Sequence, residues 1–234
     1  MEMTRIAHVE NDFPEKFGLP RQPGILCDIP ARIVFEPAYR DKNALRGLEG
    51  FERLWLLWQF DRVGPSGFSP TVRPPKLGGN TRMGVFATRS PNRPNPIGLT
   101  CVRLDRIEWE GADAPVLVVR GADMKNGTAI LDIKPYLPYA DAYPDARAGF
   151  TQQIDTTRLA VLDPSSLLLS LPAEKREVLR SVLSGDPRPG YQREAESYGI
   201  AYAGFNIRFS VQGETLTITK IEIISQKETK CHDE

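Results

Sequence analysis

Short apolar segments separated by glycine, proline and polar residues predict a chain built mainly from β-strands. In several of them apolar and polar positions alternate, which is the period of a strand with one face in a core. Residues 37–46 differ, because their pattern is typical of a helical turn or a short helix. Strands are expected at residues 4–9, 31–35, 48–63, 83–87, 97–109, 115–120 and from residue 129 onward.

The segment after residue 97 shows the alternation most clearly. One face of this strand is expected to carry Leu99, Cys101 and Arg103, and the other Thr100, Val102 and Leu104. A polar turn at residues 110–113 separates it from the apolar segment 115–120. The two segments therefore predict a β-hairpin.

The most apolar stretch, residues 48–63, has no usable period. Its tryptophans and the glycines around it favour a strand buried on both faces over a helix. The tryptophans are accordingly interpreted as core residues.

The second half contains one clear helix, expected at residues 172–184 with Ser170 as its cap and Gly185 at its end. Its apolar stripe consists of Val178, Leu179, Val182 and Leu183. Alternating apolar residues at 205–211 and a return at 215–224 predict a second hairpin. Residues 145–157 have no period and are interpreted as a linker, and residues 225–234 as a disordered tail.

These patterns divide the chain into residues 1–150 and 151–234. The first part is predicted to be mainly β, and the second a small α+β appendage. A doubly wound nucleotide-binding fold needs alternating strands and helices with an early glycine-rich turn. The first half has neither, so that fold is excluded.

The segment 88–98 contains three prolines and a glycine, which exclude a helix and a central strand. The chain as a whole has 30 basic and 30 acidic residues. Seven of the basic residues lie between positions 73 and 106, together with one acidic residue. Basic charge on a rigid loop is typical of a site for phosphate or another anion. A structural loop with solvated arginines is the alternative.

The amino-acid composition argues against several kinds of active site and against a membrane span. The three cysteines are far apart and odd in number, which favours reduced thiols in the cytoplasm. The two histidines lie at opposite ends of the chain, so a histidine metal site and a Ser-His-Asp triad are both unexpected. We find no pattern of a signal peptide and no apolar run long enough for a membrane span.

The segment GVFATRSPNRPNPIGL at residues 84–99 resembles the signature of the TsaA-like (TrmO) family. Segments 20–24, 70–75, 132–136 and 186–189 resemble the same family, so the similarity extends over nearly the whole chain. The resemblance implies a β-barrel and a homodimer whose active site lies close to the subunit interface. It implies methyl transfer from S-adenosylmethionine, without a metal, to threonylcarbamoyl-adenosine beside the anticodon of tRNA.

The family pattern also implies contacts to the methyl donor. These would be made by Gln22, Pro23, Gly24, Asp61, Arg62, Arg89, Leu99, Asp123, Met124, Lys125 and Asn126. Two places depart from the pattern. Asp61 and Arg62 stand where His and Gln are expected, and Asn126 stands where an acid is usual.

Tyr136 and Asp132 are the candidates for orienting the acceptor or handling its proton. Arg93 and Arg188 are candidates for a phosphate or for the threonine carboxylate, because a guanidinium group matches either. Lys134 stands among tyrosines and prolines, a mixture that suits a nucleobase platform, although aromatic packing along a loop explains it as well. A non-catalytic module that binds RNA or senses S-adenosylmethionine is the competing hypothesis.

Overall fold

The computed structural model describes residues 2–19, 29–61, 68–74, 81–153, 158–188 and 197–224. Four of the residues expected at the methyl donor, Gln22, Pro23, Gly24 and Arg62, lie outside these ranges. The predicted tail at residues 225–234 lies outside them too.

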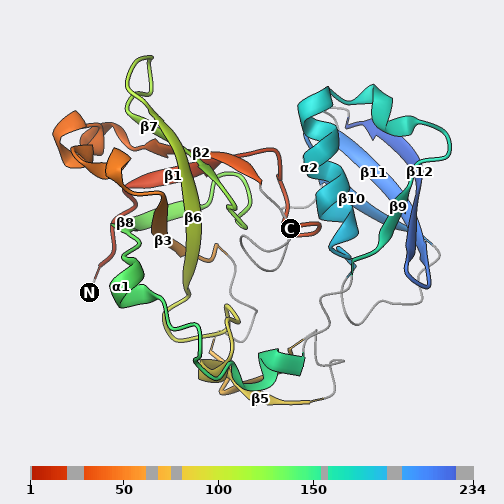
Figure 1. Cartoon of the computed structure of the whole chain (residues 1–234), viewed down its shortest axis with the longest axis horizontal. Helices are drawn as coiled ribbons and strands as arrows, with labels where there is room; N and C mark the ends of the chain where they lie inside the picture. Colours follow the sequence, from red (N-terminus) through yellow and green to blue (C-terminus); the bar gives the residue numbers. More distant parts are fainter. Residues whose placement is uncertain are drawn as a thin grey trace.

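Six strands of the N-terminal half form a closed barrel in the order β1-β2-β7-β6-β3-β8 (Figure 1). Every neighbouring pair is antiparallel, and closure leaves no free sheet edge. The barrel confirms the β-rich prediction and the expected hairpin of β6 and β7. The strands are β1 (Ala7–Glu10), β2 (Pro30–Phe35), β3 (Arg53–Gln59), β6 (Ile97–Glu108), β7 (Val116–Arg120) and β8 (Ala129–Pro135).

The inward side chains of these strands build the first hydrophobic core. On β6, Thr100 and Val102 are buried while Leu99 is 47% exposed, which confirms the expected alternation. On β3, Leu54 and Leu56 are fully buried.

Trp55 between them belongs to the outer face, where its indole N–H donates to the carboxylate of Asp141 at 3.0 Å. The prediction that this strand is buried on both faces is therefore wrong. The apolar run has no period because its outward positions are apolar too.

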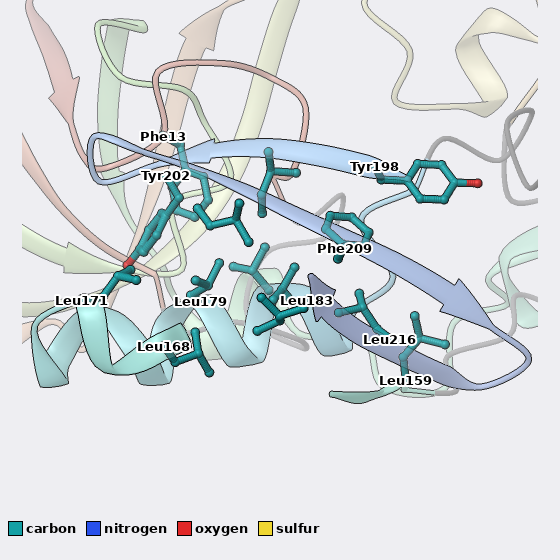
Figure 2. Packing of buried hydrophobic residues seen from close by; sticks show 14 of the residues in the cluster. Phe13, Leu159, Leu168, Leu171, Leu179, Leu183, Tyr198, Tyr202, Phe209 and Leu216 are labelled. Carbon is teal, nitrogen blue, oxygen red and sulfur yellow. The ribbon is translucent and has the colours of Figure 1, made fainter. Parts of the chain in front are cut away.

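The C-terminal half forms a four-stranded sheet in the order β10-β11-β12-β9, covered by helix α2 (Ala173–Ser184). Figure 2 shows Leu179 and Leu183 of the helix pointing to Phe209 and Leu216 of the sheet. The helix and its stripe are as predicted. The strands are β9 (Ala160–Leu162), β10 (Tyr198–Tyr202), β11 (Phe205–Gln212) and β12 (Thr215–Ile223).

Two details of this half differ from the prediction. Pro172, not Ser170, is the cap residue of α2, and the Ser170 hydroxyl instead donates to the carbonyl of Leu167 at 2.7 Å. Strands β9 and β10 were not predicted. The first has only three residues, and it pairs in parallel with β12, more than fifty residues away.

The connection between β1 and β2 joins the two cores. Phe13 is 1% exposed, and its ring centroid lies 4.9 Å from that of Tyr202 in the second core (Figure 2). Ile29 belongs to the second core as well. At Gly18, which has a φ of +90°, a Cβ would lie 2.9 Å from Ile200. The connection thus fastens the appendage to the barrel, and the division at residue 150 stays a prediction.

The remaining elements are short. A two-stranded ribbon of β4 (Thr71–Val72) and β5 (Met83–Gly84) is followed by a 3-10 turn, η5 (Val85–Ala87), so the strand expected at 83–87 ends after two residues. After β8 the expected extended loop contains a helical turn, α1 (Pro138–Asp141). The other 3-10 turns are η1 (Pro37–Tyr39), η2 (Lys42–Leu45), η3 (Leu48–Gly50), η6 (Gly149–Gln153) and η7 (Leu167–Ser170). Within the described ranges, no helix has the length and apolar character needed to cross a membrane.

Candidate functional site

Three connections of the barrel meet at one end, which we call the loop end. Because neighbouring strands are antiparallel, the ends of β1, β3 and β7 and the starts of β2, β6 and β8 share this end. The connections that leave it are residues 11–29, 60–96 and 121–128. Each of them carries residues that the sequence placed at the methyl donor. The topology therefore explains how positions a hundred residues apart can contribute to one site.

An ion cluster ties the three connections together. Asp61 accepts from Lys16 at 2.8 Å and also pairs with Lys125. Lys16 comes from the first connection, Asp61 from the second and Lys125 from the third. Partial burial would raise the pKa of Asp61, but hydrogen bonds and charge from the two lysines prevail and lower it to about 2. Asp61 is therefore a carboxylate at neutral pH.

A second contact links the barrel wall to the third connection. The indole N–H of Trp58 donates to the Thr100 hydroxyl at 3.0 Å, and that hydroxyl donates to Oδ1 of Asp123 at 2.7 Å. Burial raises the pKa of Asp123, while Thr100, the backbone N–H of Asp123 and the charge of Arg89 act in the opposite direction. A half-buried acid with a raised pKa near an arginine is typical of a ligand site.

The position of Trp58 depends on its partner across the strands. Trp58 pairs with Gly98, where a Cβ would lie 2.2 Å from the indole ring. Glycine thus lets the ring lie against β6. The Phe60 ring follows at 4.3 Å, and its backbone N–H donates to the carbonyl of Pro96 at 2.9 Å. Two aromatic rings therefore lie together at the loop end, and the Trp58 indole is joined to Asp123 through the Thr100 hydroxyl.

The basic loop at residues 88–96 is held by its own hydrogen bonds. Arg93 donates from Nε to the carbonyl of Ser90 at 2.9 Å and from Nη2 to that of Val85 at 3.1 Å. It also donates to the carbonyl of Thr88. Its guanidinium group is thus engaged by backbone carbonyls of the loop and of η5. Arg89 is exposed and close enough to Asp123 to influence its pKa.

The structure separates the residues expected at the donor into two locations. Asp61, Arg89, Asp123 and Lys125 lie at the loop end, whereas the Leu99 side chain lies on the outer face of the barrel.

Two further residues expected at the methyl donor, Met124 and Asn126, already make contacts within the protein. Met124 is 1% exposed in the barrel core, and its carbonyl accepts from the Asn11 side chain at 2.7 Å. The amide oxygen of Asn126 accepts from the backbone N–H of Asn11 at 3.1 Å.

The candidates for the acceptor lie on the outer face as well. In the register, Asp132 pairs with Leu57 and Leu57 with Leu99, while Lys134 pairs with Trp55 in the next row. Lys134 and Asp132 form an ion pair at 2.7 Å. We call Leu99, Asp132, Lys134 and Tyr136 the outer-face group.

Tyr136 lies at the end of β8 that is remote from the loop end. Its backbone N–H donates to the carbonyl of Arg53, the first residue of β3, and its ring centroid is 5.9 Å from that of Trp55. Five residues of β3 at about 3.3 Å each put its backbone roughly 16 Å from that of Trp58. Within one chain, Tyr136 is therefore not adjacent to Asp123.

Arg188 belongs to the appendage. Its guanidinium group binds Asp186 through two hydrogen bonds, at 2.7 and 2.8 Å, and its side chain is 13% exposed. Hydrogen bonds and charge from Asp186 raise the pKa of Arg188, so its guanidinium group stays cationic, and the Asp186 carboxylate offsets that charge. Its contact with a phosphate stays a prediction.

Three residues of the loop end, Thr100, Trp58 and Lys16, were not predicted from the sequence as site residues. Thr100 carried a usable signal, since it is a lone polar residue on the face shared with Val102 and Leu104. Trp58 was interpreted only as core. Lys16 gave no signal, because lysine is common in polar loops.

The described residues contain no group of three or more His, Cys, Asp and Glu side chains that could hold a metal. The expectation of a reaction without a metal stays a prediction.

Comparison with known proteins adds the family. Residues 8–142 match the family model described as tRNA-methyltransferase O N-terminal domain, and residues 163–224 match the one described as TrmO C-terminal domain. A tRNA (adenine(37)-N6)-methyltransferase of Escherichia coli is 38% identical over 231 residues, which is 94% of this chain and 97% of that protein.

Two further similarities cover most of the chain. A Pseudomonas aeruginosa protein, named as a proposed S-adenosylmethionine-dependent methyltransferase, is 37% identical over 206 residues, covering 85% of this chain and 87% of its own length. The crystal structure of TrmO from Pseudomonas aeruginosa superposes with a TM-score of 0.75 at 29% identity, and the match covers 95% of this chain and 97% of that chain.

Proposed function

The chain belongs to the tRNA-methyltransferase O family, and from this premise we propose that it is a tRNA methyltransferase that uses S-adenosylmethionine. The methyl group goes to the N6 nitrogen of adenosine 37, beside the anticodon, in its threonylcarbamoyl form. The observation that supports this most is the meeting of three connections at the loop end, where the half-buried acid Asp123 lies.

The loop end fits the methyl donor. Asp123 can accept hydrogen bonds from the ribose hydroxyls, and the Phe60 ring, which packs on Trp58, offers a surface for an adenine ring. Arg89 and Lys125 supply positive charge for the donor's carboxylate. S-adenosylmethionine supplies an electrophilic methyl group when bound. The protein's residues bind and orient it.

The transfer itself requires positioning more than strong acid–base catalysis. The N6 nitrogen contributes the electron pair of the new N–C bond, the S–C bond breaks toward sulfur, and the nitrogen loses its proton. The carbamoyl group makes that proton more acidic, which lessens the demand on a base. Holding the acceptor in line with the S–C bond then accounts for much of the rate.

The acceptor is proposed to lie against the outer-face group, where Asp132 and Tyr136 orient it or take its proton and Lys134 contacts the RNA. This group and Asp123 lie on different parts of one barrel. We therefore propose a homodimer in which the outer-face group of one copy faces the loop end of its partner. Exposed apolar side chains support it: Phe86 is 74% and Leu99 47% exposed.

In this arrangement the appendage helps to hold the tRNA, with Arg188 and Arg93 as the remaining candidates for phosphate contact. A protein of this activity is proposed to work in the cytoplasm, where its tRNA substrate is found.

The test uses purified full-length protein, undermodified tRNA and S-adenosylmethionine labelled in its methyl group. After digestion to nucleosides, the label should appear in an adenosine that carries both the threonylcarbamoyl and the methyl group. Binding of tRNA or of the donor without transfer would instead identify a non-catalytic RNA-binding or donor-sensing module. Size-exclusion chromatography with light scattering tests the dimer independently.

A further inference from the structure

Thr100 is unusual among the inward residues of the barrel. It is 1% exposed, and with Thr128 it is one of two polar side chains classed as buried in the described part of the chain. Its hydroxyl lies between two specific groups, the Trp58 indole at 3.0 Å and the Asp123 carboxylate at 2.7 Å.

The chemistry of these groups sets the direction of the hydrogen bonds. An indole N–H can only donate, so the Thr100 oxygen must accept from Trp58. The single hydroxyl proton is then available for Asp123, which as a carboxylate can only accept. Trp58 thus directs the Thr100 hydroxyl proton toward Asp123. The three groups form one hydrogen-bond chain in which each group donates to the next, from Trp58 through Thr100 to Asp123.

The hydrogen-bond chain begins on two paired strands of the barrel wall. Trp58 and Thr100 lie on the paired strands β3 and β6, and Gly98 leaves the space for the indole ring that a Cβ would fill at 2.2 Å. Asp123, by contrast, lies on the connection after β7, outside any strand. The orientation of a side chain on a connection is set by such contacts with the scaffold.

We propose that Thr100 and Trp58 are positioning residues of the methyl-donor site, which hold Asp123 so that it accepts hydrogen bonds from the two hydroxyls of the donor's ribose. The inference rests on the proposed function. Thr100 engages Oδ1 only, and a carboxylate can accept about four hydrogen bonds, so acceptor capacity is left for a diol. Arg89 already compensates part of the negative charge, which favours a hydroxyl over the sulfonium as the group that Asp123 recognises.

The experiment is calorimetric titration of the full-length protein with S-adenosylmethionine and with S-adenosylhomocysteine. The two nucleosides share the ribose, but only the first has the sulfonium charge. Thr100→Val removes the hydroxyl at nearly constant volume, and Thr100→Ser restores it. We expect Thr100→Val to weaken binding of both nucleosides by about tenfold, as for a lost hydrogen bond to a charged group. Thr100→Ser should stay within about twofold of the wild type.

Two further variants separate positioning from general stability. In an Asp123→Asn background, Thr100→Val should weaken binding by less than about twofold, because the carboxylate on which it acts is gone. Trp58→Phe keeps an aromatic ring but removes the N–H donor, and it should weaken both nucleosides in the same ratio as Thr100→Val does. It also keeps the test available should Thr100→Val fail to fold.

Unchanged affinity in both Thr100→Val and Trp58→Phe would overturn the inference while leaving the proposed function intact. A loss confined to S-adenosylmethionine would overturn the assignment to ribose, since the sulfonium would then be the group recognised. If the wild type binds neither nucleoside, the proposed function fails, and this inference fails with it.

Discussion

The ion cluster at Asp61 gives the most quantitative prediction. Replacing Asp61 by Asn removes the charge that Lys16 and Lys125 share, while the side chain keeps its size. A pKa lowered from 3.8 to about 2 corresponds to about 2.5 kcal/mol between pH 7 and strong acid. The Asp61 side chain is 35% exposed, and screening by water reduces this to about 1 kcal/mol.

The pH dependence follows from the sign of the shift. The folded pKa of Asp61 is depressed, so its contribution is fully present above pH 4 and is lost as the pH falls toward 2. In a protein of this length, 1 kcal/mol corresponds to about 3 °C in Tm. Asp61→Asn should therefore lower the Tm by about 3 °C at pH 7, and the difference from the wild type should shrink steadily between pH 4 and pH 2.5.

The assay is thermal unfolding followed by circular dichroism across this pH range. Glu222→Gln is the matched control, because it removes the same kind of charge from an exposed pair, Glu222 and Lys220, at 2.7 Å in the appendage. Such pairs contribute little, so its Tm should change by less than about 1 °C. If Asp61→Asn is as stable as the wild type at pH 7, or if its Tm follows pH in parallel with the wild type, the reasoning about the cluster is wrong.

Three other substitutions test the loop end. Gly98→Ala forces a methyl group against the Trp58 indole ring and should lower the free energy of unfolding in urea by about 2 kcal/mol. Gly84→Ala, with nothing within 4 Å of the added methyl group, should be neutral, and equal effects of the two substitutions would refute the packing argument. Arg89→Ala should weaken S-adenosylmethionine binding in calorimetry without lowering the Tm, and full affinity would remove Arg89 from the site. Arg93→Ala should make the basic loop sensitive to limited proteolysis, and Arg93→Lys should not restore resistance, because lysine cannot bond several carbonyls with one planar group; a resistant Arg93→Ala loop would contradict this.

Local periodicity predicted much of the fold. The two faces of β6 and the stripe of α2 are where the sequence placed them, because one face of each element packs on a core. The stretch around β3 could not be resolved in the same way. Its outward positions, such as Trp55, are apolar too, so buried and exposed faces look alike in the sequence.

Contacts between distant segments were beyond the sequence. Nothing local marks Phe13 as a member of the second core, although it packs there almost fully buried. Truncation after residue 150 would expose Phe13 and Ile29, which pack in the second core. The truncated protein should therefore aggregate rather than behave as an isolated barrel. Single substitutions in the full chain are therefore the better way to divide the roles of barrel and appendage.

The sequence pointed to residues for the candidate site but not to the contacts that those residues make. The family resemblance and the loop composition pointed to Arg89, Asp123 and Lys125, which the topology brings to one end of the barrel. A pattern of residue types does not show what a side chain already binds. Arg93 and Arg188 were attractive as free cations, yet the first bonds its own loop and the second bonds Asp186.

Methyl transfer to a matched pair of tRNAs tests the central claim most directly. One tRNA carries threonylcarbamoyl-adenosine beside the anticodon, and the other, of identical sequence, carries plain adenosine there. With labelled S-adenosylmethionine, the account predicts label at N6 of that nucleoside in the first tRNA only, and loss of most of this label with Asp123→Asn. Tight binding of the donor and of the first tRNA, with no label transferred to it, would contradict the account.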